Sequence, residues 1–452
     1  MPLQRITMRR IAKAAVGLML LTVTGSFAAE VQWPRFRGSD AGAIADDPAL
    51  PDTWSEKENV VWKTTIPGLG WSSPVVWDDH VFVTSAVSEG QEPPPTVGFY
   101  DEHDHVQASA AQHWMVYDVE FRTGKIRWER DLRRAVPPLL RHGKNSYASE
   151  TAATDGARVY VYFGSIGLAA ALDFTGRVLW TTDLGAFNTM IDLGPGASPV
   201  VFGNLMVIVQ DNAKQSYIIA LDTRSGSEVW RVKREEPGSW ATPFVWENNV
   251  RTEIVTAGSR RVRSYDLNGT LLWELRGMSD ATIPSPFSRH GLVYINSGSG
   301  GSTLRPVYAI RPGASGDISL KAGETSNEYI AWQQPFLGTY TASGLVYGDY
   351  YYTLNDRGFL LCHDARTGKE IYGRQRVSAD SSGFTASPWA YNGRIFLLSE
   401  DGDTYVVQAG PEFKVIGKNS LDQIPLATPA VLRGSVIMRT LSHLYRISKL
   451  RR

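Results

Sequence analysis

The stretch ALDTRSGSEVWRV, residues 220–232, decides the fold of this chain. An apolar run ends at Asp222, a Ser-Gly turn follows, and alternation of apolar and polar residues resumes through Val232. Gly226 can supply the positive φ that such a turn needs, and Asp222 can accept hydrogen bonds from its own turn backbone. The stretch therefore predicts a β-hairpin, and Trp230 gives it a large flat face for packing between adjacent sheets.

This phrase of an acidic residue, a glycine and an aromatic residue recurs along the chain. Its other copies are Glu120, Gly124 and Trp128; Asp173, Gly176 and Trp180; Asp266, Gly269 and Trp273; and Asp364, Gly368 and Tyr372. A recurrence at this spacing is the sign of a repeat architecture, in which one supersecondary unit is stacked several times.

A second repeated signal lies upstream, where small residues and proline precede a β-branched strand, a polar turn and another strand. It is clearest at residues 72–85, and the other openings are Ala152, Pro199, Pro243, Pro286, Ser343, Pro388 and Pro429. Most steps between openings are near 44 residues, as from Pro199 to Pro243. Eight openings with about four strands each predict an all-β protein, an eight-bladed β-propeller of four-stranded antiparallel blades.

The two ends of the repeat region predict how the ring closes. After Pro429 there is room for three strands only, whereas residues 59–68 hold a spare strand with Trp62 ahead of the first opening. Pairing of this N-terminal strand with the C-terminal blade would remove two exposed sheet edges. We therefore expect one propeller over residues 29–452, with insertions at 86–113 in blade one and 313–328 in blade five.

The composition fits a large folded domain with no general attraction to polyanions. The chain has 452 residues, of which 43% are hydrophobic, and it carries 46 basic and 46 acidic residues. This neutral balance predicts neither a nucleic-acid partner nor binding to an anionic membrane surface. Cys362 is the single cysteine, so no intramolecular disulfide is expected, and its strand context favours a buried small hydrophobe.

The first 28 residues have the pattern of a signal peptide. An apolar stretch follows several basic residues, and Ser26 and Ala28 fit a small-x-small cleavage site. The apolar stretch is short for a membrane span. We expect cleavage after Ala28 by export through the Sec or the twin-arginine route. The mature chain would then be a periplasmic or secreted monomer without a transmembrane anchor.

The Ala-x-Asp-x-x-Thr-Gly-x-x-x-Trp phrase resembles the tryptophan-docking repeat of pyrroloquinoline quinone (PQQ) propellers. Residues 33–43 and 142–156 are similar to a widespread group of exported bacterial PQQ-like repeat proteins. The superfamily includes quinoprotein alcohol dehydrogenases and a non-catalytic propeller lipoprotein that assists outer-membrane protein assembly. The resemblance therefore implies an eight-bladed fold and leaves both an enzyme and a scaffold open.

Candidate site residues lie in the loops that precede the innermost strands, because such loops converge at one end of a propeller channel. Several of these loops carry an aromatic residue: Trp71, Tyr147, Trp240, Tyr340 and Phe384. Aromatic side chains around a funnel suit a flat organic ligand, and they can equally plug the channel.

The loop at residues 141–150 carries the densest chemistry. Glu150 could ligate calcium or act as a base, and Lys144 and Asn145 could hold an anionic ligand. Asp211 and Asn212 could add oxygen ligands for a hard cation. The alternatives are a structural ion-pair network in the first loop and a tight turn in the second.

The tract YDEHDHV, residues 100–106, is rich in histidine and acidic residues. It could bind zinc or another divalent metal. It could equally be a solvated acidic loop that covers the funnel.

Three functions follow from these residues. The first is a non-catalytic scaffold that binds an envelope protein, a small molecule or a glycan. The second is a PQQ- and calcium-dependent dehydrogenase, in which Glu150 or Asp211 would be catalytic. There the metal ligands would be Glu150, Asp211 and Asn212, and the cofactor-binding residues Trp71, Lys144, Asn145, Tyr147, Trp240, Arg260 and Tyr340. One cysteine cannot form the disulfide between adjacent cysteines that the alcohol dehydrogenases place over PQQ.

The third function is a polysaccharide-directed enzyme with Trp71, Trp240 and Tyr340 as sugar platforms.

Overall fold

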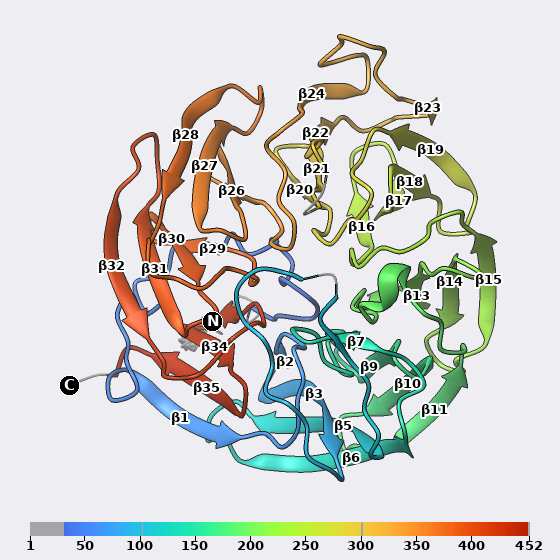
Figure 1. The fold of residues 1–452 in the computed structure, drawn as a ribbon, viewed down its shortest axis with the longest axis vertical. Helices are drawn as coiled ribbons and strands as arrows, with labels where there is room; N and C mark the ends of the chain where they lie inside the picture. The colour runs from blue at the N-terminus through green and yellow to red at the C-terminus, as the bar shows by residue number, and fades with distance from the viewer. Residues whose placement is uncertain (1–30, 102, 300–301, 451–452) are drawn as a thin grey trace, which may run out of the picture. The chain divides into compact units, whose positions relative to one another are not determined.

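A computed structural model describes residues 31–101, 103–299 and 302–450. These residues form eight antiparallel sheets of four strands arranged around one axis, and a fifth short strand extends one of them (Figure 1). The fold is the eight-bladed β-propeller that the repeats predicted. One short 3-10 helix, Met190–Asp192, is the only helix among the described residues.

The strands of blades one to four follow the chain in order. Blade one contains β2 (Val75–Trp77), β3 (His80–Ser88), β5 (Gln112–Glu120) and β6 (Ile126–Ala135), and blade two contains β8 (Ala153–Thr154), β9 (Arg158–Phe163), β10 (Leu168–Asp173) and β11 (Val178–Asp183). Blade three contains β12 (Val200–Phe202), β13 (Leu205–Gln210), β14 (Tyr217–Asp222) and β15 (Glu228–Lys233), and blade four contains β16 (Phe244–Glu247), β17 (Thr252–Ala257), β18 (Arg261–Tyr265) and β19 (Leu271–Arg276).

Blades five to eight repeat this arrangement. Blade five contains β20 (Phe287–Arg289), β21 (Leu292–Asn296), β22 (Val307–Ile310) and β24 (Ile330–Gln334), and blade six contains β25 (Leu345–Tyr347), β26 (Tyr350–Leu354), β27 (Phe359–Asp364) and β28 (Glu370–Arg376). Blade seven contains β29 (Trp389–Tyr391), β30 (Arg394–Leu398), β31 (Asp403–Gln408) and β32 (Val415–Ser420), and blade eight contains β33 (Ala430–Leu432), β34 (Ser435–Arg439), β35 (His443–Ser448) and β1 (Val60–Thr65).

The ring closes through the N-terminal strand, as predicted. β1 pairs antiparallel with β35, and Figure 1 shows the two strands side by side. Trp62 on β1 donates from Nε1 to the Phe121 carbonyl oxygen at 2.9 Å, which links blade eight to blade one. The closing strand therefore contributes both a sheet edge and a contact between blades.

Tryptophans of the outer strands lie against the glycine of the next repeat. Trp180 donates from Nε1 to the Thr223 carbonyl oxygen at 3.0 Å, and a Cβ added to Gly226 would lie 2.4 Å from its ring. The same contact joins Trp62 to Gly124, Trp128 to Gly176, Trp230 to Gly269, and Trp332 to Gly368. Each such glycine thus serves two purposes, because it adopts a positive φ and leaves room for an indole.

Replacement of Gly226 by alanine should destabilise the fold by about 3 kcal/mol, because backbone strain and a clash with Trp180 add. Gly203 is the matched control, since its φ is +57° and a Cβ there would meet nothing within 4 Å. Gly203→Ala should therefore cost only about 1 kcal/mol of strain. Urea unfolding of both variants measures the difference, and equal losses would show that the indole contact contributes nothing.

A ring of hydroxyl groups joins the innermost strands around the channel. The Ser73 N–H donates to Thr151 Oγ1 at 2.9 Å, and the Thr151 N–H donates to Ser198 Oγ at 2.9 Å. The series continues from blade to blade through Thr242, Ser285, Ser343, Ser387 and Thr428. One hydroxyl residue stands at or just before each opening in the sequence. This periodic signal of the ring was not recognised from the sequence.

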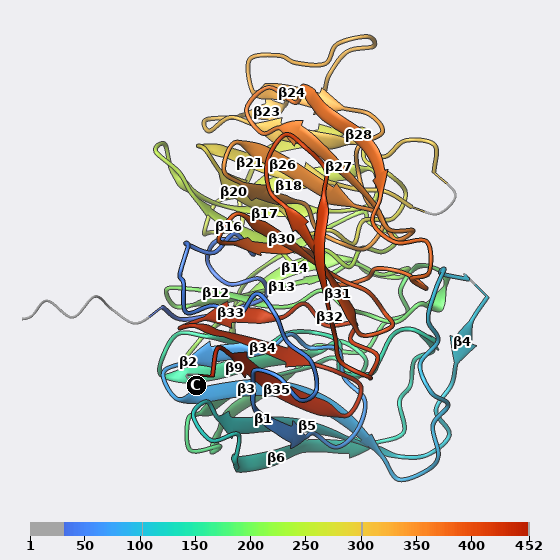
Figure 2. The ribbon, with the colours of Figure 1, turned by 90° about the vertical axis from the view of Figure 1, so that its left-hand side faces the viewer.

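Two irregular segments cover the two ends of the channel. Residues 31–56 run across one end, where Trp33 pairs with Val76, Arg37 donates to the Gly344 carbonyl oxygen at 2.7 Å, and Phe36 lines the channel. Residues 89–101 and 103–111, between β3 and β5, cover the other end and include the short strand β4 (His105–Val106), which pairs with β7 (Arg141–His142). Figure 2 shows β4 and the blue N-terminal segment at opposite faces.

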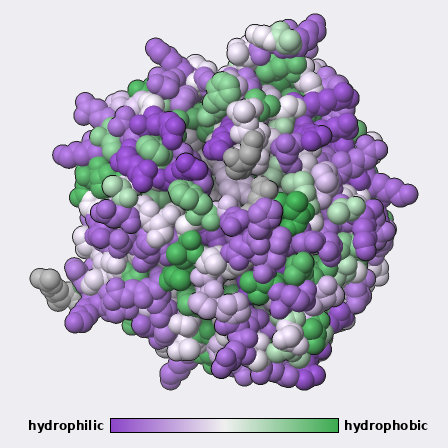
Figure 3. All heavy atoms as spheres, viewed as in Figure 1, coloured by the Kyte–Doolittle hydropathy of each residue, from purple (hydrophilic) through white to green (hydrophobic). Residues whose placement is uncertain are grey.

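A third irregular segment, between β22 and β24, extends the neighbouring blade. Its short strand β23 (Gly316–Asp317) pairs parallel with the outer strand β19 of blade four. Among the described residues, no helix has the length and apolar character that a membrane crossing requires. The face seen in Figure 3 is mostly hydrophilic, with small and separate hydrophobic patches.

Candidate channel site

The channel contains a small cavity at the end that residues 89–111 cover. Its volume is about 150 Å³, and the sequence-predicted residues that line it are Trp71, Lys144, Asn145, Trp240 and Tyr340. Tyr100, His142 and Leu426 complete much of its wall. The structure therefore brings five of the predicted site residues together around one space.

Both cavity tryptophans are held in place by hydrogen bonds to neighbouring loops. Trp71 donates from Nε1 to the Lys144 carbonyl oxygen at 2.9 Å, and Trp240 donates to the Gly194 carbonyl oxygen at 2.6 Å. Both side chains are buried. Because their polar edges are satisfied inside the protein, the indoles present mainly apolar surface to the cavity.

A buried ion pair lies beside the cavity. Lys144 Nζ is 2.6 Å from Glu400 Oε1, and each side chain is 1% exposed. Thr385 donates from Oγ1 to the same carboxylate oxygen at 2.7 Å. Burial lowers the pKa of Lys144, and the charge of Glu400 opposes that shift. The pair joins the loop before blade two to the loop between β30 and β31, and Glu400 was not among the predicted site residues.

Residues 97–101, which we call the plug segment, close the cavity at its mouth. The Gly98 N–H donates to Glu400 Oε2 at 2.7 Å, and Lys144 Nζ donates to the Gly98 carbonyl oxygen at 2.5 Å. The Tyr100 ring lies 4.5 Å from Lys144 Nζ and meets Tyr340 edge-on at 5.1 Å. The loop between β3 and β5 passes in front of the channel in Figure 1. Tyr100 was part of the predicted histidine-rich tract and was not recognised as a cavity residue.

His142 holds the end of the plug segment. Its Nε2 donates to the Asp101 carbonyl oxygen at 2.9 Å, while its Nδ1 accepts from the Lys144 N–H at 3.0 Å. Burial lowers the pKa of His142. The neutral ring therefore fits this position, because one nitrogen donates and the other accepts.

Glu150 is buried and is not among the residues that line the cavity, although its neighbour Ser149 is. Its side chain accepts from the Gly164 N–H at 2.9 Å. Burial raises the pKa of Glu150 to about 7. With this pKa, the Glu150 carboxyl group is about half protonated at neutral pH.

Replacement of Glu150 by glutamine should reduce the dependence of stability on pH. Because the folded-state pKa of about 7 lies above the ordinary value of 4.5, the folded state binds more protons than the unfolded state within that window. The contribution of Glu150 to the free energy of unfolding is therefore present at low pH. About 3 kcal/mol of it is lost as the pH rises through 7. Urea unfolding at pH 5 and pH 8 should show a loss about 3 kcal/mol smaller in Glu150→Gln than in the wild type and in the exposed control Glu228→Gln. A remaining loss is expected in all three chains, because burial also raises the pKa of Glu236 to about 7.

Asp211 and Asn212 are engaged in internal hydrogen bonds. Arg234 contacts both carboxylate oxygens of Asp211, at 2.7 and 3.0 Å, and Ser239 donates to Oδ2 at 2.6 Å. Asn212 Oδ1 accepts from the N–H groups of Lys214 and Gln215, as in the tight turn that was the alternative. Neither carboxylate nor amide therefore has the free oxygens that a metal site needs.

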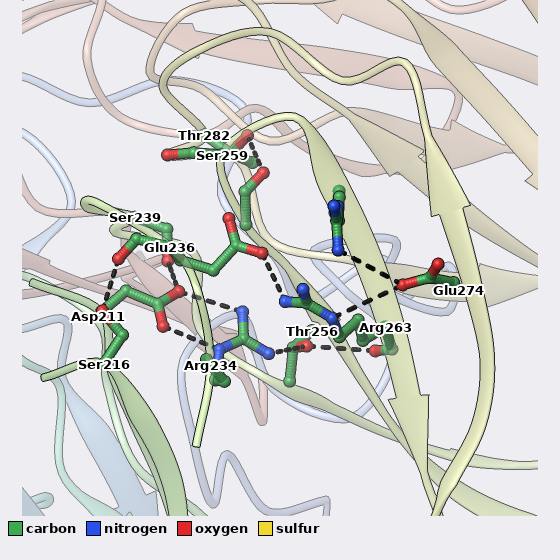
Figure 4. A network of polar contacts seen from close by, with 12 residues as sticks. Asp211, Ser216, Arg234, Glu236, Ser239, Thr256, Ser259, Arg263, Glu274 and Thr282 are labelled. Atoms are coloured by element: carbon green, nitrogen blue, oxygen red, sulfur yellow. Dashed lines mark hydrogen bonds and ion pairs between the residues drawn. The ribbon is translucent and has the colours of Figure 1, made fainter. Parts of the chain in front are cut away.

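The Asp211 pair is part of a larger buried network between blades three and four. Figure 4 shows Arg234 between Asp211 and Thr256, and Arg263 between Glu236 and Glu274. Arg263 lies 2.5 Å from Glu236 Oε1. Burial raises the pKa of Glu236 to about 7, against the opposing charge of Arg234. The alternating charges connect the two blades and do not line the cavity.

The other predicted site residues lie elsewhere. Arg260 pairs with Asp280 at 2.5 Å, and its side chain is 77% exposed. The Tyr147 hydroxyl accepts from the Ala108 N–H at 3.1 Å, and its ring packs in a core between blades. His105 donates to the Ile191 carbonyl oxygen at 2.9 Å. Within the described ranges, no group of three or more His, Cys, Asp or Glu side chains is placed to hold a metal ion.

These features define a class of protein: an eight-bladed propeller whose repeats are joined by indole contacts and whose channel is closed by its own chain. Residues 112–372 match the family model described as outer membrane protein assembly factor BamB. This match covers more than half of the chain, so the chain belongs to that family. The resemblance to PQQ-like repeat propellers is thereby confirmed.

Solved structures share the fold. BamB from Moraxella catarrhalis aligns with a TM-score of 0.57 and 12% identity, over 86% of this chain and 99% of that chain. A europium-containing methanol dehydrogenase aligns with a TM-score of 0.56 and 11% identity, over 86% of this chain and 88% of that one. The computationally designed Ika8 protein aligns with a TM-score of 0.52 and 12% identity, over 86% and 99%. No curated protein sequence gives a significant match.

Proposed function

We propose that this chain is a non-catalytic binding scaffold of the cell envelope. The observation that carries the proposal is the placement of its candidate catalytic carboxylates. Glu150 and Asp211 lie outside the cavity, and their oxygens are engaged by Gly164, Arg234 and Ser239. The cavity therefore offers a surface for contact, and the chain's own acids are used to hold the blades together.

The residues present do not fit PQQ with calcium. Calcium takes six to eight oxygen ligands, and Glu150, Asp211 and Asn212 do not converge on the cavity. Arg260, the second candidate for the cofactor's carboxylates, is exposed and paired with Asp280.

The residues around the cavity fit a polysaccharide-directed enzyme less well than a scaffold. Glycoside cleavage usually needs two carboxyl groups that flank the sugar bond. Among the described residues that line the cavity, none is Asp or Glu. Trp71, Trp240 and Tyr340 do lie together, so their aromatic surface is available only for binding.

The family and the N-terminal sequence support a proposal for the partner and the compartment. The family description names outer-membrane protein assembly, and we propose that the partner is an envelope protein. The signal peptide expected at residues 1–28 lies outside the described residues, and its sequence pattern supports export to the periplasm or beyond.

The test has one arm for the PQQ-dependent dehydrogenase and one for the scaffold. Purified protein is mixed with PQQ and Ca²⁺, desalted and measured for bound chromophore, and alcohol oxidation is followed with a dye acceptor. We expect no retained chromophore and no dye reduction. Crosslinking in intact cells, followed by isolation of the chain, should recover a defined envelope protein. Dye reduction that depends on PQQ would contradict the scaffold function.

A further inference from the structure

The plug segment is seated in the cavity mouth as a peptide ligand would be. Glu400 accepts the Gly98 N–H at 2.7 Å, and Lys144 donates to the Gly98 carbonyl oxygen at 2.5 Å. A carboxylate and an ammonium group thus bind both polar groups of one residue's backbone. Such charge-assisted hydrogen bonds are short and strong, and they recognise main chain whatever its side chains.

The Tyr100 ring fills an aromatic subsite next to these backbone contacts. The ring lies over the Lys144 ammonium group at 4.5 Å and against the His142 ring at 4.8 Å. Tyr340 meets it edge-on at 5.1 Å. Cation–π and edge-to-face contacts both select an aromatic side chain at this position.

The plug segment otherwise has little apolar surface buried against the blades. Val97 and Phe99 on either side of Gly98 are 41% and 59% exposed. The Arg357 guanidinium group lies over the Phe99 ring, 4.5 Å from its centroid. A segment held by a few polar contacts and one ring opens at a lower free energy than the blades that carry it.

We propose that the cavity mouth binds an extended peptide of a partner protein. In the absence of that peptide, residues 98–100 occupy the mouth as an internal ligand. The peptide that fits presents a main-chain N–H and C=O to Glu400 and Lys144, and an aromatic side chain two residues later. This inference rests on the scaffold function, and it names the chemistry that the scaffold recognises.

The test uses a fluorescently labelled peptide with the sequence of residues 96–101, TVGFYD, added to the full-length protein. Tyr100→Ala vacates the aromatic subsite and leaves the Lys144 and Glu400 side chains in place, although it removes the contact between the ring and the Lys144 ammonium group. Fluorescence anisotropy should show this variant binding the peptide at least about tenfold more tightly than the wild type, since buried aromatic anchors typically dominate such interfaces. A peptide with alanine in place of its tyrosine should lose that binding. Phe99→Ala is the matched control and should behave like the wild type.

A second variant opens the mouth by another route. Gly98 has a φ of +93° and donates its N–H to Glu400, so Gly98→Pro removes the hydrogen bond and cannot adopt the backbone conformation. This variant should also bind the peptide, and Lys144→Met with Glu400→Gln in the Tyr100→Ala background should abolish binding.

The proposal is wrong if both opened variants melt like the wild type and still bind the peptide no better. It is equally wrong if the alanine peptide binds as tightly as the tyrosine peptide. Either result leaves the scaffold function standing, because that function fails on PQQ-dependent dye reduction and not on this peptide.

Discussion

Removal of residues 31–66 should abolish cooperative unfolding of the propeller. The deletion takes away β1, which pairs with β35 and supplies the outer strand of blade eight. It also removes five large buried side chains: Trp33, Leu50, Trp54, Trp62 and Ile66. At about 1.5–3 kcal/mol each, their burial is worth about 10 kcal/mol. Because a folded domain is stable by only about 5–15 kcal/mol in total, the open ring should not survive as a unit.

The control is a chain in which a short turn replaces residues 89–111. Ser88 and Gln112 are directly paired across β3 and β5, so a turn can join these strands. This deletion removes no strand of any blade. Calorimetry should show one sharp transition for the control and a broad or absent one for the 31–66 deletion. A single sharp transition for the 31–66 deletion would mean that β1 is dispensable for closure.

The blade number and the closure could be predicted because their signals are local. The turn at Gly226 and the strand β15 that follows it are decided within one repeat, and the repeat recurs. The spare strand with Trp62 was visible because the last blade lacked a fourth strand. The hydroxyl ring through Ser73 and Thr151 had an equally regular signal. Its serine and threonine residues were interpreted only as part of the small-residue pattern that marks each opening.

The site could be predicted only in part, because its contacts join residues far apart in the sequence. Lys144 was expected near the channel, but its partner Glu400 lies 256 positions later. The cavity mouth is filled by Tyr100, which comes from an insertion with no counterpart in the other repeats. A carboxylate such as Asp211 in a loop faces either the channel or a neighbouring blade, and only the position of Arg234 decides between them.

Replacement of Arg234 by methionine should be among the most damaging single substitutions in the protein. Arg234 and Asp211 are both 0% exposed, and the arginine contacts both oxygens of the carboxylate. Without the arginine, an ionised carboxylate remains buried with only Ser239 as its hydrogen-bond donor among the contacts described above. Breaking a buried pair in this way typically costs about 3–5 kcal/mol.

Arg260→Met is the matched control, because it makes the same change in an exposed pair. Arg260 and Asp280 are 77% and 57% exposed, and an ion pair in solvent contributes at most about 1 kcal/mol. Urea unfolding should therefore separate the two variants by at least about 2 kcal/mol. The double variant Asp211→Asn with Arg234→Met should recover much of the loss, since it leaves no buried charge unpaired. Equal stability of the two single variants would show that Asp211 serves some purpose other than holding blades three and four together, and the case for a ligand at that carboxylate would reopen.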